Sequence, residues 1–226
     1  MTTMKFIVTA GGDELDLQSP QRGHITAWSI AWSLSQINRF NGHAIRPYSV
    51  AEHSLLVCEI AAREFGLDPH GLLAAHLHDA HEAFCGDVVS PAKAQIGPGW
   101  ADYEARWAHL VRSCFAVLTP SRDQIDAIHQ ADLIALATER RDLMPHTTTP
   151  WSVLEGVYPA NWVDLYSPER RAMNWEGWRD RWLDRYHELE YARDPNLLMI
   201  VPATRWWFEG DLGRAPDEAS PPRGSP

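Results

Sequence analysis

The segment HLHDAHEAFCGD, at residues 76–87, constrains this chain more than any other, because it gathers ionisable side chains in an otherwise apolar stretch. His78 and Asp79 lie between Leu77 and Ala80, with the apolar GLLAA run before them and Ala83 and Phe84 after them. This pattern predicts a helix whose apolar side chains are buried. A histidine and an aspartate buried together need a partner for their charge, and a divalent cation is the simplest one.

Two residues in neighbouring segments could complete a metal site. On a continuous helix, His78 and Asp79 diverge by about 100°, so both reach an ion lying between their directions, and Glu82 lies over His78. His53, in AEHSLL, and Asp132, in HQADLIALATE, each interrupt an apolar helical pattern. Two histidines and two aspartates suit Mn, Fe, Co, Ni or Zn better than Ca or a structural zinc.

The rest of the chain predicts helices joined by loops. Helix signals include the capping boxes that begin at Ser49 and Ser121, and Gly66 as a helix end. The predicted fold class is therefore all-α: a single helical domain over residues 1–194 with a short N-terminal β-hairpin, followed by a flexible Pro/Gly/Ser-rich tail at 195–226. The predicted elements are a hairpin at 5–17, helices at about 19–40, 49–66, 68–86, 100–118, 121–144 and 167–193, a loop at 87–99 and an irregular packed segment at 145–167.

Charge and cysteine content limit the setting and the partners. The formal charge is −10, which disfavours nucleic acid as a partner because phosphate backbones require a basic surface. The N-terminus has no signal-peptide pattern, and no apolar run is long enough to cross a membrane. Three cysteines without a CxxC pair indicate a reducing environment. We therefore expect a cytoplasmic protein with neither a membrane nor a nucleic-acid partner.

The order H…HD…D resembles the HD-domain superfamily of metal-dependent phosphohydrolases. Within it, HDAHEAFCGDVVSPAK (78–93) resembles the motif of bacterial HD-domain 5′-deoxynucleotidases and of related phage proteins, among them dATP triphosphohydrolases. NRFNGHAIRPYSVAEHS (38–54) and ADLIALATERRDLM (131–144) resemble the segments around the first and last ligands. The resemblance covers roughly residues 5–145 and implies an HD-type helical bundle.

The resemblance also implies a role for each matching residue. His53, His78, Asp79 and Asp132 would bind the metal, and Glu82 and Asp87 would position and activate the attacking water. Arg39 would hold the substrate phosphate, Phe40 would contact the sugar or base, and Lys93 would be a second phosphate contact. Phe40 departs from the tryptophan usual in the monophosphate enzymes, which leaves the preference for base or sugar open.

The implied activity is removal of the 5′-phosphate from deoxynucleoside monophosphates, which are small-molecule substrates. An alternative is a triphosphohydrolase acting on a deoxynucleoside triphosphate such as dATP, with additional Mg helping to bind the longer phosphate chain. The small number of basic residues before position 95 favours the monophosphate. An alternative of another class is a catalytically degenerate nucleotide sensor. By analogy with related HD nucleotidases, we also expect a homo-oligomer.

Overall fold

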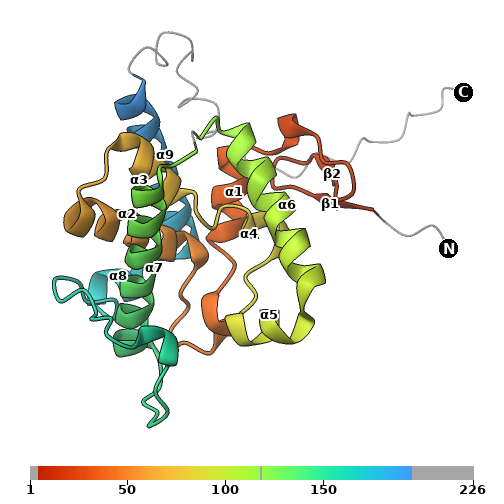
Figure 1. Cartoon of the computed structure of the whole chain (residues 1–226). Coiled ribbons are helices and arrows are strands. Elements are labelled where there is room, and N and C mark those ends of the chain that lie inside the picture. Colours follow the sequence, from red (N-terminus) through yellow and green to blue (C-terminus); the bar gives the residue numbers. More distant parts are fainter. Residues whose placement is uncertain (1–4, 118, 195–226) are drawn as a thin grey trace, which may run out of the picture.

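The computed structural model describes residues 5–117 and 119–194, and it confirms an all-α fold with a small N-terminal sheet (Figure 1). The predicted tail at 195–226 lies outside the described residues. Three short 3₁₀ turns lie at Arg22–His24, Arg39–Gly42 and Ser152–Leu154. The strands and helices are β1 (Phe6–Val8), β2 (Glu14–Asp16), α1 (Ala27–Leu34), α2 (Val50–Phe65), α3 (Pro69–His76), α4 (Glu82–Cys85), α5 (Ser90–Ile96), α6 (Pro98–Cys114), α7 (Arg122–Leu143), α8 (Pro168–Ala172) and α9 (Trp175–Arg193).

The predicted hairpin is confirmed. Strands β1 and β2 pair antiparallel, with Ile7 opposite Leu15. The Leu15 side chain is completely buried and belongs to the main hydrophobic cluster. The hairpin is therefore attached to the helical body by the apolar face of one strand.

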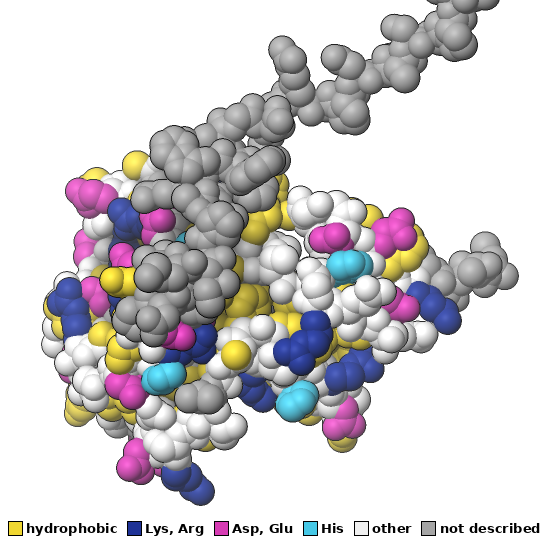
Figure 2. Space-filling model, turned by 90° about the horizontal axis from the view of Figure 1, so that it is seen from above, with side chains coloured by type: hydrophobic (Ala, Val, Ile, Leu, Met, Phe, Trp, Pro, Cys, Tyr) yellow, Lys and Arg dark blue, Asp and Glu magenta, His cyan; other side chains and the backbone are white. Residues whose placement is uncertain are grey.

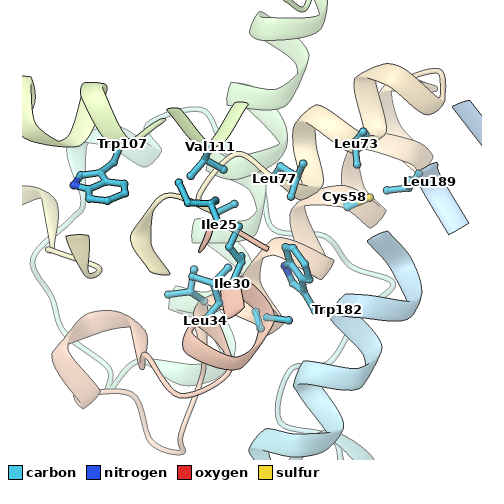
Figure 3. Packing of buried hydrophobic residues seen from close by; sticks show 14 of the residues in the cluster. Ile25, Ile30, Leu34, Cys58, Leu73, Leu77, Trp107, Val111, Trp182 and Leu189 are labelled. Atoms are coloured by element: carbon cyan, nitrogen blue, oxygen red, sulfur yellow. The ribbon is translucent and has the colours of Figure 1, made fainter. Parts of the chain in front are cut away.

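Two hydrophobic clusters hold the helices together. The larger one joins α1, α3, α6 and α9, and Figure 3 shows side chains from these helices pointing toward one another. The smaller one joins α2 and α7 to the irregular segment 145–167, through the buried residues Ala160 and Leu165. Helix α2 contributes to both clusters and packs on α3, α7 and α9, so most of its side chains are buried.

The predicted helix at 19–40 is wrong at both ends. Thr26 caps α1, since its hydroxyl accepts from the Ser29 backbone N–H, and the helix then ends at Leu34. The residues that follow form a separate turn in which Phe40 and Asn41 have φ angles of 56° and 52°. Such left-handed angles end a right-handed helix. Arg39 and Phe40 therefore lie in a turn and not on a helix.

The predicted continuous helix at 68–86 is also wrong, because it breaks between α3 and α4. In an unbroken helix the Ala75 carbonyl would accept from the Asp79 N–H. Instead it accepts from the His78 ring at 2.8 Å and from the His78 backbone N–H. His78 and Asp79 thus lie in the turn between the two helices, and the relation expected between His78 and Glu82 on one helix face does not apply.

Two further predicted boundaries are wrong. The segment predicted as a loop at 87–99 contains α5 and the start of α6. Pro91 and Pro98 each lie in the first turn of a helix, where proline is tolerated, so these prolines begin helices and do not exclude them. The predicted last helix is divided into α8 and α9, and Asn174 caps the second of them.

One face of the molecule carries charge of both signs. On the face shown in Figure 2, acidic and basic side chains are interspersed, with hydrophobic side chains between them toward the middle. Among the helices of the described chain, none combines the length and the apolar character needed to cross a bilayer.

Candidate metal centre

Three helical segments bring the four predicted ligands together. His53 lies on α2, His78 and Asp79 lie in the turn after α3, and Asp132 lies on α7. Helix α2 packs against both α3 and α7, which run beside it in Figure 1. Residues separated by up to 79 positions therefore form one site, which we call the ligand cluster.

The ligand atoms of this cluster gather around the two imidazole Nε2 atoms. The Nε2 atoms of His53 and His78 are 3.3 Å apart. Asp79 Oδ2 lies 3.1 Å from His78 Nε2 and 3.5 Å from His53 Nε2. Asp132 Oδ1 lies 3.2 Å from His53 Nε2. His53, His78 and Asp132 each offer a ligand atom within 4.8 Å of the other two.

The partners of the two imidazoles decide what this cluster can bind. His53 Nδ1 donates to a Glu139 carboxylate oxygen at 2.6 Å, and His78 Nδ1 donates to the Ala75 carbonyl at 2.8 Å. In the neutral rings, each Nε2 must then carry a lone pair. Two imidazole lone pairs and two carboxylates consequently face one another, an arrangement that only a proton or a metal cation can stabilise.

The pKa values reflect this crowding of acceptors. Burial and the nearby Arg39 oppose protonation of His53, yet Glu139 and the bonds to Asp132 and Asp79 raise its pKa well above the ordinary value. Burial would raise the pKa of Asp79, but the two histidines hold it well below its usual range. Without a metal ion, a proton on the His53 imidazole serves as the cation, and a divalent ion can replace it.

Glu139 is the principal residue that the sequence analysis missed. Its side chain is fully buried, and its two oxygens contact His53 and Arg39. The available signal was its spacing: Glu139 follows Asp132 by seven residues on α7, which places both on one face of the helix. A carboxylate on the ligand face of an apolar helix is the kind of residue that fixes a ligating histidine.

A second group of ionisable residues lies beside the ligand cluster. We call it the rim cluster, and it consists of His81, Glu82, Lys93 and Glu104. Lys93 Nζ lies 2.5 Å from Glu104 Oε1, and His81 Nε2 lies 3.7 Å from the same oxygen. Glu82 Oε2 is buried and has no hydrogen-bond partner in the described structure. Glu104, on α6, had no distinguishing pattern in the sequence.

Glu82 and Asp87 both hold their protons more tightly than ordinary carboxylic acids. Burial, with the charges of Asp79 and Asp87, raises the pKa of Glu82 to about 9. Burial also raises the pKa of Asp87. The negative charge of Asp79 contributes to the raised pKa of both residues, consistent with a position beside the ligand cluster.

The predicted substrate contacts lie on two sides of the ligand cluster. Arg39 lies 3.7 Å from Asp79 Oδ2 and 3.2 Å from Glu139, with its guanidinium 5.4 Å from the Phe40 ring centre. Phe40 in turn packs near Trp151, with ring centres 6.2 Å apart. Lys93 belongs to the rim cluster, where its Glu104 contact outweighs burial and raises its pKa. Arg39 and Lys93 thus supply positive charge near Asp79 from different segments.

Comparison with family models finds no match for this chain. Among curated proteins, the chain is 36% identical to the uncharacterized protein YfdR of Escherichia coli (strain K12) over 154 residues, which cover 68% of this chain and 81% of that protein. It is 38% identical to the uncharacterized protein RCAP_rcc00048 of Rhodobacter capsulatus over 136 residues, or 58% of this chain and 69% of that protein. Neither description states an activity, so any function has to be argued from the site.

Proposed function

The chain belongs to the family of the Escherichia coli protein YfdR, and we propose that it is a metal-dependent phosphohydrolase of the HD type acting on deoxynucleotides. One observation carries the proposal: the two Nε2 atoms of His53 and His78 face each other at 3.3 Å with carboxylates around them. Both rings are held in the orientation that a metal ion requires.

The donor set fits a first-row divalent metal. Two imidazole nitrogens and two carboxylate groups suit Co, Mn, Zn, Ni or Fe. A bound divalent ion polarises a phosphoryl oxygen and lowers the pKa of a water molecule. His53, His78, Asp79 and Asp132 would hold this ion.

Glu82 is the residue best suited to transfer a proton in this reaction. Its free Oε2 and its pKa of about 9 mean that it carries a proton at neutral pH in the metal-free protein. A carboxylic acid with a raised pKa can donate to a leaving oxygen, and its conjugate base can accept from water. Asp87, whose pKa is also raised, is the second candidate for this role.

Arg39 and Lys93 would bind the phosphate. The Arg39 guanidinium is planar and stays charged, so it can contact two phosphate oxygens at once. Its Nε atom is buried and has no hydrogen-bond partner among the described residues, which leaves a donor available. Phe40, in the same turn, offers an aromatic ring for the sugar or base.

The test is a nucleotide panel with the full chain. Protein stripped of metal and reloaded with Mn, Co or Zn is incubated with deoxy- and ribonucleotides, and the products are separated by chromatography. We expect orthophosphate and a deoxynucleoside from the monophosphates. Release of intact triphosphate would favour the triphosphohydrolase, in which additional Mg would support the longer phosphate chain. Nucleotide binding without turnover by any metal form would favour the sensor.

We also propose that the protein works in the cytoplasm as a homo-oligomer. All three cysteines are free in the structure, which is compatible with a reducing environment. Light scattering of the purified full chain tests the assembly, and a mass equal to that of one chain at all concentrations would reject it.

A further inference from the structure

Glu139 joins two parts of the site that the sequence places far apart. Its Oε1 accepts from His53 Nδ1 at 2.6 Å, and its Oε2 accepts from Arg39 Nη2 at 3.2 Å. We propose that Glu139 is a positioning residue that orients the metal ligand His53 and the phosphate-binding Arg39 together, so that metal binding and phosphate binding depend on one carboxylate. This inference rests on the proposed function.

The bond from Nδ1 to Glu139 orients the His53 ring. Because His53 Nδ1 donates its hydrogen bond to Glu139, the Nε2 lone pair is directed into the ligand cluster. A carboxylate on the far side of an imidazole also makes the ring a stronger ligand. His78 Nδ1 donates to a neutral carbonyl, whereas His53 Nδ1 donates to a charged carboxylate.

The position of Arg39 depends on two carboxylates that attract it, those of Glu139 and Asp79. Its Nη2 contacts Glu139, while its Nη1 lies 3.7 Å from the ligand oxygen of Asp79. Without the charge of Glu139, Asp79 becomes the nearest carboxylate that can pair with this arginine. Asp79 would then be drawn toward Arg39 and away from the metal, and Arg39 would be less available to phosphate.

Glu139 is completely buried between its two partners. One oxygen accepts from His53 Nδ1 and the other from Arg39 Nη2, and the side chain has no exposed area. Removing the charge of one member of a buried, hydrogen-bonded group is strongly destabilising, because its partners are left without a hydrogen-bonded counter-charge. A neutral replacement should therefore disturb both His53 and Arg39.

The experiment measures binding as well as activity. Glu139→Gln keeps the side-chain shape and removes the charge. We expect the affinity for Mn²⁺, measured by calorimetry on the full chain, to fall about 10- to 100-fold, the usual cost of losing such a support. We also expect the affinity of the Mn²⁺-saturated variant for inorganic phosphate to fall, because Arg39 has moved.

The matched control is Glu52→Gln. Glu52 is another fully buried carboxylate. It precedes His53 on α2, but its side chain pairs with Arg46 and Arg170 and makes no hydrogen bond or ion pair with the ligand cluster in the described structure. Its variant should lose thermal stability while binding Mn²⁺ and phosphate as the wild type does. A loss of Mn²⁺ affinity as large as in Glu139→Gln would mean that general loosening explains the effect, and would overturn the proposal.

Two further outcomes are decisive. If Glu139→Gln folds and binds both Mn²⁺ and phosphate like the wild type, the positioning role is wrong. If it does not fold, Glu139→Asp replaces it: the shortened carboxylate cannot reach both partners, so an unchanged Mn²⁺ affinity would equally overturn the proposal. Failure of the wild type to bind Mn²⁺ would instead reject the proposed function.

Discussion

Two clusters of histidines and carboxylates lie next to each other in this protein, and they differ in how their charges are balanced. In the ligand cluster, the outward nitrogens of both imidazoles are bonded to acceptors elsewhere, so the inward atoms are all acceptors. In the rim cluster, Lys93 lies among the acidic groups at 2.5 Å from Glu104. Arg39 approaches the first cluster from one side, 3.7 Å from Asp79 Oδ2, whereas the lysine of the second bonds directly to one of its carboxylates.

Residue type alone therefore does not make a metal site. His81, Glu82 and Glu104 approach one another within 4.8 Å, as His53, His78 and Asp132 do. The partners outside each cluster assign the roles: Glu139 and the Ala75 carbonyl prepare one cluster for a metal. In the other, burial and the charges of Asp79 and Asp87 outweigh Lys93 and leave Glu82 protonated, suited to proton transfer.

The largest expected effect comes from Asp79→Ala. Removing this ligand leaves two imidazoles and one carboxylate, and we expect the affinity for Mn²⁺ to fall by on the order of 100-fold or more, beyond the loss typical of an outer partner. Turnover should fall to background. Calorimetry and metal analysis of the purified variant measure this, with Asp126→Ala, an exposed change on α7, as the control. Full metal retention would remove Asp79 from the ligand cluster.

Glu82→Gln should distinguish the role of the rim cluster from that of the ligand cluster. We expect turnover to fall about 10²- to 10⁴-fold, the usual contribution of a proton-transfer group, while Mn²⁺ affinity stays near that of the wild type. Glu59→Gln, which alters a surface carboxylate paired with Arg63, is the matched control. A variant that loses its metal would show that Glu82 belongs to the ligand cluster, and a fully active one would end its assignment as the proton carrier.

The metal-free protein should lose stability as pH rises. The pKa of Glu82 is raised from 4.5 to about 9 by burial and by Asp79 and Asp87. Between these values the folded protein keeps a proton that the unfolded chain has released, so the stabilising contribution is complete below the lower value and is lost as pH passes the upper one. Glu82→Gln cannot titrate, so its unfolding midpoint in urea should fall less steeply than that of the wild type over this range. Parallel pH curves for the two proteins would contradict the raised pKa.

Much of the fold could be predicted because the signals were local. Ser49, Gly66 and Ser121 predicted helix ends that the structure contains, since capping depends on a few adjacent residues. The break after α3 could not be predicted, because it depends on a bond from the His78 ring to the Ala75 carbonyl that competes with the helical pattern. Pro91 was interpreted as part of a loop, yet it begins α5.

The same division applies to the site. The four ligands could be proposed because each interrupts an apolar pattern, and the structure brings them together. Glu139 also follows an apolar helical pattern, but in the sequence it stands among the other charged residues of the run ATERR. Glu104 is partly buried on the same side of α6 as Trp107, but only the packing of α5 against α6 brings Lys93 to it. Long-range pairs of this kind leave no local signal.

The smallest effect is expected from Glu104→Gln, which tests whether the rim cluster is a second metal site. A metal there would have to displace Lys93 from Glu104, so we expect the wild type to bind one Mn²⁺ per chain at concentrations that saturate the ligand cluster. Glu104→Gln should then bind the same number, with an affinity changed by about fivefold or less, because a partly exposed ion pair contributes no more than ~1 kcal/mol. Calorimetric stoichiometry decides the matter. If the wild type binds two ions and the variant one, the rim cluster is itself a metal site and Lys93 gives way to the second ion.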